Sequence, residues 1–217
     1  MDLNYEKINL HDYITSDTKN SFEGHNFPAH SVIYKEGEHP SGIFFITDGL
    51  VGLTYQSKNG AESLLRIFTS QSFLGHRSLF SNEPYHATAT TLHETRALFI
   101  PKEKAMEMLL SNKELMVAFI KLLSRDLKNS EIRFRDMIGK RVESRVIEAL
   151  FYLKKRHPDY VWTRREIGEF CGAKTETVSR VLTKLEKEGH IIKEGRKVHF
   201  RDEEKFLNLF SDNNEES

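Results

Sequence analysis

Seven residues in the middle of the chain repeat at alternating steps of four and three. They are Met116, Ile120, Leu123, Leu127, Ser130, Phe134 and Met137. This spacing places them along one seam of a helix about 33 Å long. Leu115, Phe119 and Leu122 form a second apolar face on the same helix. The two faces predict that the helix packs on its own fold with one and contacts a second copy, in a parallel homodimer, with the seam.

The residues before this helix follow a different period. Between about Phe22 and Pro101, short runs of β-branched and aromatic residues alternate with turn residues. The runs are 31–34, 42–47, 50–55, 63–68, 87–92 and 96–100. Asn59-Gly60 lies between two of them and is typical of a hairpin turn. Many short strands at this spacing predict a sandwich or a jelly-roll-like β-barrel.

The residues after the long helix predict a helix–turn–helix followed by a hairpin wing. Thr163 and Glu166 have the spacing of a capping box, which begins a helix. Gly172 suits the left-handed end of that helix. A second helix is expected over 175–188, and a β-hairpin over 190–200. The predicted fold class is therefore α+β: a jelly-roll-like β-barrel (1–112), a long dimerisation helix (113–138) and a C-terminal winged helix–turn–helix with an acidic tail (139–217).

The second helix of the predicted pair has an apolar face and a polar face. Arginine can bond guanine O6 and N7 together, glutamate can accept from cytosine N4, and serine can reach either base edge. The polar face carries these residue types, so we expect it to bind double-stranded DNA. The candidate DNA-binding residues are Arg164, Lys174, Thr175, Glu176, Thr177, Ser179, Arg180 and Lys184.

The charge distribution supports this placement. The whole chain has 32 basic and 32 acidic residues and a formal net charge of zero. Residues 139–201 nevertheless hold 16 Lys and Arg against 9 Asp and Glu, whereas residues 202–217 hold 1 against 6. A basic segment of this kind favours a polyanion as its partner.

Other functional classes are disfavoured by what the chain lacks. Its single cysteine, Cys171, excludes an intrachain disulfide and a cysteine-ligated cluster. A cupin-like metalloenzyme, the runner-up class, would need a His-x-His pair, and the ten histidines contain none. We therefore expect neither enzyme activity nor a bound metal. The first residues lack a signal-peptide pattern and no apolar run is long enough for a membrane span, which predicts a cytoplasmic protein with no membrane partner.

Several motifs resemble one known family. They are Tyr34-Lys-Glu-Gly37, Gly42-Ile-Phe-Phe-Ile-Thr-Asp-Gly49, Phe73-Leu-Gly75, Thr163-Arg-Arg-Glu-Ile-Gly168 and Glu176-Thr-Val-Ser-Arg180. Over roughly residues 20–205 the chain resembles the Crp/Fnr superfamily of bacterial transcription regulators. The resemblance implies a homodimer that binds a two-fold symmetric operator, with RNA polymerase as a protein partner. It places Glu176, Ser179 and Arg180 at base-reading positions, in a form similar to the Fnr branch, which reads TTGA-like half-sites.

The resemblance also implies an effector pocket, and here the sequence departs from the family pattern. The matching positions are Gly75, His76, Arg77, Ser78, His86, Ala87 and Thr88. Cyclic-nucleotide binders carry a Gly-Glu pair and a later Arg-Ser or Arg-Thr pair, where this chain has His76 and His86. We therefore predict no cofactor and no control by cyclic AMP, and we assign no other effector.

Three alternatives stay open for this pocket. His76 or Arg77 binds another anion, side chains fill the pocket, or His76 and His86 ligate a haem. A sensor module of this kind, acting through protein partners rather than DNA, is the alternative to a transcription regulator.

Overall fold

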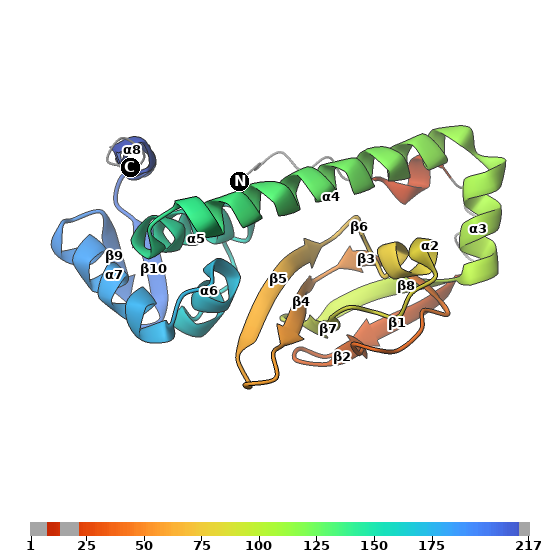
Figure 1. The fold of residues 1–217 in the computed structure, drawn as a ribbon, viewed down its shortest axis with the longest axis horizontal. Coiled ribbons are helices and arrows are strands. Elements are labelled where there is room, and N and C mark those ends of the chain that lie inside the picture. The colour runs from red at the N-terminus through yellow and green to blue at the C-terminus, as the bar shows by residue number, and fades with distance from the viewer. Residues whose placement is uncertain (1–7, 14–21, 213–217) are drawn as a thin grey trace. The chain divides into compact units, whose positions relative to one another are not determined.

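The chain divides at Leu127 into two compact units. The computed structural model describes residues 8–13 and 22–212 (Figure 1). The unit that ends at Leu127 holds two β-sheets and their covering helices, and the unit that begins at Lys128 is mainly helical. The helix α4 (Lys113–Gly139) contributes residues to both units.

The first unit contains two open four-stranded sheets, ordered β1-β8-β3-β6 and β2-β7-β4-β5. The strands are β1 (Glu23–Phe27), β2 (Val32–Tyr34), β3 (Gly42–Asp48), β4 (Leu50–Gln56), β5 (Glu62–Thr69), β6 (Ser72–Leu74), β7 (Thr88–Thr91) and β8 (Thr95–Pro101). All neighbouring strands are antiparallel. The prediction of a jelly-roll-like fold is confirmed, although the sheets remain two layers and do not close into one barrel.

The predicted hairpin at Asn59-Gly60 joins β4 to β5. These strands pair from Leu50↔Thr69 to Gln56↔Glu62. Gly60 has a φ of 82°, and the Asn59 side-chain oxygen accepts a hydrogen bond from the Ala61 amide at 3.2 Å. A positive φ is easily reached by glycine, so this turn follows directly from the dipeptide.

Four short elements of this unit were not expected from the sequence. They are the 3-10 helix η1 (Leu10–Asp12), β1, β6 and the helix α2 (His76–Ser81). The helical region after Pro101 also contains two helices, α3 (Lys102–Ser111) and α4. Asn112 separates them, because its side-chain oxygen accepts a hydrogen bond from the Leu115 amide at 3.0 Å and so caps α4.

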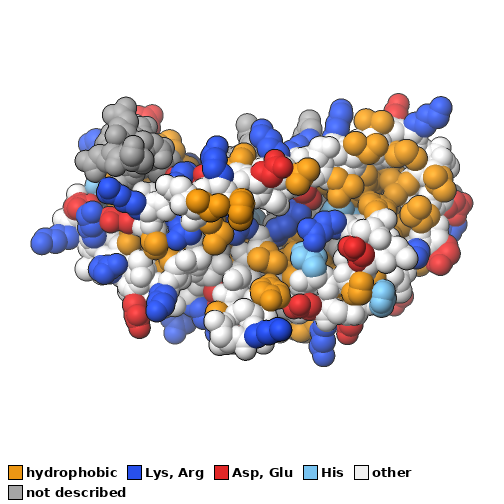
Figure 2. Space-filling model, viewed as in Figure 1, with side chains coloured by type: hydrophobic (Ala, Val, Ile, Leu, Met, Phe, Trp, Pro, Cys, Tyr) orange, Lys and Arg blue, Asp and Glu red, His pale blue; other side chains and the backbone are white. Residues whose placement is uncertain are grey.

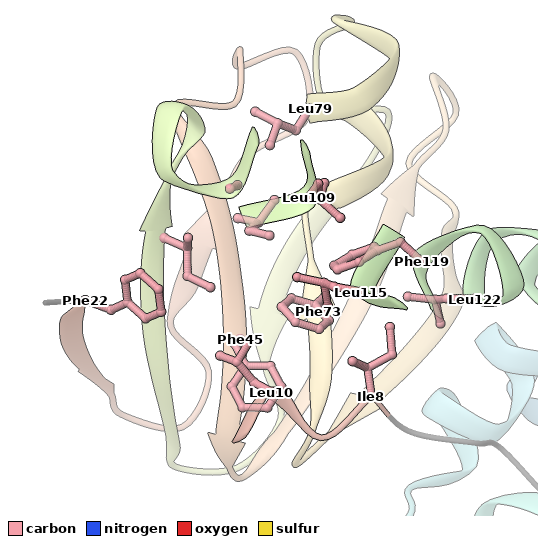
Figure 3. Packing of buried hydrophobic residues seen from close by; sticks show 13 residues of the cluster. Ile8, Leu10, Phe22, Phe45, Phe73, Leu79, Leu109, Leu115, Phe119 and Leu122 are labelled. Carbon is pink, nitrogen blue, oxygen red and sulfur yellow. The ribbon is translucent and has the colours of Figure 1, made fainter. Parts of the chain in front are cut away.

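A hydrophobic core fills the space between one sheet and the helices that cover it (Figure 3). Leu115, Phe119 and Leu122 of α4 are buried in it together with Phe45 and Phe73 of the sheet. The rings of Phe119 and Phe73 lie 4.8 Å apart. The prediction that this face of the helix packs on its own fold is confirmed. A second core cluster joins the two sheets and includes Ile46, Leu74, Val51, Leu53 and Phe68.

The second unit is a winged helix–turn–helix. Its elements after α4 are α5 (Val142–Arg156), α6 (Arg164–Cys171), α7 (Thr175–Lys187), β9 (Ile191–Glu194), β10 (Lys197–Phe200) and α8 (Glu203–Asp212). The predicted helices and hairpin are all present. The helix α8 was not expected, and Phe206 anchors it by packing against Phe200 and Phe151 at 4.5 and 6.1 Å between ring centroids. None of the described helices is long and apolar enough to cross a membrane.

Candidate DNA-binding surface and effector pocket

The helix α6 begins with the predicted capping box. The Glu166 amide donates to Thr163 Oγ1 at 3.1 Å, and the Thr163 amide donates to Glu166 Oε2 at 2.8 Å. Two backbone donors that the helix leaves unpaired are thereby satisfied. Tyr160 donates its hydroxyl hydrogen to Glu166 Oε1 at 2.6 Å, which ties the preceding loop to the same residue.

Two glycines set the close approach of α6 and α7. Gly172 ends α6 in the left-handed conformation, with a φ of 68°. At Gly168, an added Cβ would lie only 2.4 Å from the Ala173 carbonyl oxygen. Since that carbonyl belongs to the turn backbone, a larger residue at Gly168 would push the turn away from α6. These glycines therefore fix the orientation of α7.

The helix α7 buries one face and exposes the other, as predicted. Val178, Val181, Leu182 and Leu185 are at most 4% exposed. On the opposite side Glu176 and Arg180 are exposed, and the described part of the chain holds no ion-pair or hydrogen-bond partner for either side chain. Ser179, which is half-buried, donates its hydroxyl hydrogen to the Thr175 carbonyl at 3.0 Å. The arginine and glutamate are thus available to an external ligand.

The flanking candidates differ in their surroundings. Lys174 and Arg164 are exposed, and no carboxylate among the described residues pairs with them. Thr175 is exposed at the first turn of α7, and Thr177 is half-buried. Lys184, in contrast, binds Glu143 of α5 at 2.7 Å, and this carboxylate raises the pKa of Lys184. A phosphate contact by Lys184 would have to replace that ion pair.

The seam of α4 is largely uncovered within one chain. Ile120, Leu127, Phe134 and Met137 are between 52% and 69% exposed. Ser130 is also exposed, whereas Met116 and Leu123 are half-buried. Figure 2 shows hydrophobic side chains gathered over α3 and the adjoining end of α4. Large apolar side chains at helical spacing on one face are typical of an interaction surface.

The residues of the predicted effector pocket lie around α2 and the start of β7. Gly75 precedes α2 with a φ of 79°, and His76, its first residue, is only 4% exposed. Ser78 is buried and donates to the Pro84 carbonyl at 3.2 Å. Thr88 Oγ1 accepts from the Glu36 amide at 3.1 Å, and Ala87 is completely buried. Three of these positions are thus engaged in the fold itself.

Sequence reasoning missed the strongest electrostatic feature of this region, an ion pair between β5 and α4. Arg66 donates two hydrogen bonds to the carboxylate of Asp126, and its Nη1 lies 2.7 Å from Asp126 Oδ2. The Asp126 side chain is 8% exposed and that of Arg66 27%. His76 Nε2 lies 3.8 Å from Asp126 Oδ2, and neither ring nitrogen has a hydrogen-bond partner among the described residues.

A signal for this ion pair was present in the sequence. Arg66 lies two residues before the buried Phe68, so it lies on the same, inward face of its strand. Asp126 follows Phe119 and Leu122 at helical spacing, so it lies on the buried face of α4. A charged residue on each of two apolar faces indicates that the two are paired in the core.

The remaining candidates, Arg77 and His86, are exposed. Partial burial, together with the positive charges of Arg77 and Arg66, lowers the pKa of His86 to about 4. His86 is therefore neutral at neutral pH and does not supply the positive charge that a phosphate would require. Among the described residues, no group of three or more metal-ligating side chains comes together.

Comparison with known proteins agrees with this architecture. The family model described as "Cyclic nucleotide-binding domain" matches residues 25–112, and "Crp-like helix-turn-helix domain" matches residues 144–209. The chain belongs to the Crp/Fnr superfamily of transcription regulators. Its members are DNA-binding regulators and not enzymes.

Relatives of the Crp/Fnr superfamily match most of the chain. The "CRP-like cAMP-activated global transcriptional regulator" of Mycobacterium tuberculosis is 27% identical over 189 residues, which cover 83% of this chain and 84% of the relative. The "Anaerobic regulatory protein" of Bacillus subtilis is 28% identical over 186 residues, covering 80% and 78%. A solved CRP/FNR-family regulator of Thermus thermophilus has a TM-score of 0.76 at 22% identity, covering 88% of this chain and all of that one. A c-di-GMP-responsive regulator of Xanthomonas campestris has a TM-score of 0.75 at 20% identity, covering 87% and 100%.

Proposed function

We propose that this Crp/Fnr regulator acts as a homodimer, reads a palindromic DNA operator with α7, and does not depend on cyclic AMP. In this proposal residues 1–112 form the effector half, residues 113–138 the dimerisation helix and residues 139–217 the DNA-binding half. RNA polymerase is the protein partner that family membership suggests. The observation that carries the proposal is that Glu176 and Arg180 are exposed and have no partner among the residues the structure describes, on a helix whose other face is buried in the core.

Replacing Arg180 with alanine tests base reading. A bidentate arginine–guanine contact contributes about 1–3 kcal/mol of discrimination. We expect the Arg180→Ala variant to lose this discrimination at one G·C pair in each half-site while it retains its fold, because the side chain is exposed. The measurement is binding to a set of operator duplexes that differ only at that base pair.

A matched variant separates base reading from phosphate contact. Lys174 is exposed at the start of α7 and has no ion-pair partner among the described residues. Lys174→Ala should weaken binding to all duplexes alike and lower the salt slope by about 1. An Arg180→Ala variant whose relative base preferences equal those of the wild type would refute the assignment of α7 as the reader.

The homodimer is supported by the uncovered seam. A helix whose opposite face is already buried in its own core still presents a row of large apolar side chains to solvent. A second copy packed along this row would remove them from water. It would also place two copies of α7 in a symmetric arrangement, as a palindromic operator requires.

Independence from cyclic AMP is supported by the charges in the pocket. Arg66, a guanidinium that faces the interior, is already bound to Asp126. His76 stands where the family pattern has a carboxylate for the ribose, and neutral His86 stands where it has an arginine for the phosphate. Two charge-assisted hydrogen bonds are thereby missing, each contributing about 1.5–3 kcal/mol.

Calorimetric titration with cyclic AMP is expected to detect no binding tighter than about millimolar, since the two losses reduce affinity roughly a hundred-fold to ten-thousand-fold. Operator binding should be the same with and without cyclic AMP. Micromolar affinity that Arg77→Ala abolishes would contradict this expectation, because it would mean that Arg77 replaces the missing phosphate contact.

A second candidate function is the sensing of a different anion. It is favoured by the exposed Arg77, for which the described residues provide no carboxylate partner. An anion that lacks a ribose would not need the missing carboxylate at position 76.

A further inference from the structure

A small hollow lies in the second unit, between the end of α5, the loop before α6, and β10. It has a volume of about 170 Å³, and its lining includes Lys154, Asp159, Trp162, Arg196, Lys197 and His199. A water molecule occupies about 30 Å³ of liquid, and pockets for small organic ligands begin at about 300 Å³. The hollow therefore suits one compact chemical group rather than a whole nucleotide.

The charge around the hollow is strongly positive. Lys154, Arg196 and Lys197 line it against the single carboxylate of Asp159. Within the described ranges, no carboxylate lies at ion-pair distance from any of these three cations. Lys193 on the same hairpin, in contrast, binds Glu186 at 2.7 Å. The cations of the hollow thus lack the counter-charge that their neighbour has.

Lys154 and Lys197 both line the hollow, so their positive charges repel each other. Burial and the positive charge of Lys197 lower the pKa of Lys154. Like charges that repel each other at a half-buried site are relieved when an anion binds between them. This points to an anionic group as the natural occupant.

The aromatic wall of the hollow, formed by Trp162 and Tyr160, is rigid. Trp162 is 5% exposed, and its Nε1 donates to the Leu153 carbonyl at 3.1 Å. Its ring contacts that of Tyr160 edge to face, at 4.5 Å between centroids. Tyr160 in turn is held by Glu166. Because each side chain of the wall is fixed by a partner in the fold, the hollow exists before any ligand arrives.

We propose that this hollow binds a phosphate group between Lys154 and Lys197. Two sources share that chemistry: a backbone phosphate of DNA beside the half-site, or a free phosphate. The first source rests on the proposed function, whereas the second is independent of it.

The test uses Trp162, the only tryptophan of the chain, as a built-in probe. Inorganic phosphate is titrated into the full-length protein, and fluorescence is compared with a sodium chloride titration at equal ionic strength. We expect a saturable change that chloride does not produce. Lys197→Gln should weaken it about ten- to a hundred-fold, the effect of losing a charge-assisted hydrogen bond. Lys193→Gln is the matched control and should respond as the wild type does, because Lys193 does not line the hollow.

A second titration with duplex DNA identifies the source. If the phosphate comes from DNA, the duplex changes the same fluorescence, inorganic phosphate competes with it, and Lys197→Gln lowers the salt slope of binding by about 1. If the bound group is a free phosphate, inorganic phosphate saturates the fluorescence change, and Lys197→Gln leaves the salt slope of DNA binding unchanged.

The proposal is overturned if neither phosphate nor duplex changes the fluorescence beyond chloride, or if Lys197→Gln responds as the wild type does. Lys197 is exposed, so this variant should fold, and its melting temperature verifies that. Operator binding is measured on the same samples. Operator binding with no fluorescence change from either phosphate or duplex removes only this inference, and a phosphate response without operator binding removes only the proposed function.

Discussion

Replacing Leu127 with aspartate is expected to give a folded monomer that no longer binds a palindromic operator. Leu127 is 61% exposed in the isolated chain, so the substitution disturbs no contact of the protomer core. In a dimer packed along the seam, each new carboxylate would be buried beside its symmetry copy. An unpaired buried charge costs several kcal/mol, which is enough to dissociate the dimer at micromolar concentration. Sedimentation velocity measures the expected change in mass.

Lys128→Asp is the control for this substitution. It introduces the same side chain at the adjacent position, which is exposed and lies off the seam. This variant should remain a dimer and should bind the operator. A wild-type protein that sediments as a monomer at micromolar concentration would refute the seam as an interface, and so would a dimeric Leu127→Asp variant.

Replacing Asp126 with alanine is expected to lower the free energy of unfolding by about 3 kcal/mol. Removal of one member of a buried ion pair costs about 3–5 kcal/mol. The lower end of that range applies because the Arg66 side chain is 27% exposed, so water can partly solvate its charge once Asp126 is removed. The loss should appear as a reduced midpoint in urea denaturation followed by circular dichroism.

An exposed pair of the same residue types provides the comparison. Asp48 accepts from Arg96 at 2.9 Å, and both side chains are more than 60% exposed. Exposed ion pairs contribute about 0–1 kcal/mol, so Asp48→Ala should lower the free energy of unfolding by less than about 1 kcal/mol. Equal effects of the two substitutions would mean that the Arg66–Asp126 pair contributes no more than a surface contact.

The sequence predicted those elements whose apolar period is long enough to be recognised. The hairpin at Asn59-Gly60, the buried face of α4 and the winged helix–turn–helix all follow from periodicity, turn residues and capping. The elements β6 and α2 escaped because they span only 3 and 6 residues, too few to establish a period. The helix α8 escaped because only its anchoring residue, Phe206, is buried among the positions from 203 to 209, and a single buried position sets up no period.

The site was predicted less completely than the fold, for a physical reason. The exposed positions of α7 follow from the period of one helix, and their residue types indicate DNA. The Arg66–Asp126 pair joins residues 60 positions apart, and only the tertiary fold brings them together. Each residue alone could be recognised as a charge on an apolar face, but its partner could not be identified from local sequence.

Selection of binding sites from a random duplex library by the full-length protein tests the central claim most directly. The account predicts enrichment, without cyclic AMP, of two inverted half-sites centred about 10–11 base pairs apart, each with a G·C pair at the position read by Arg180. Arg180→Ala should enrich the same spacing with that base pair relaxed. Enrichment of single half-sites or of direct repeats would contradict a symmetric dimer that reads DNA with α7. So would a selected pool whose sequences are no more enriched than those of the unselected library.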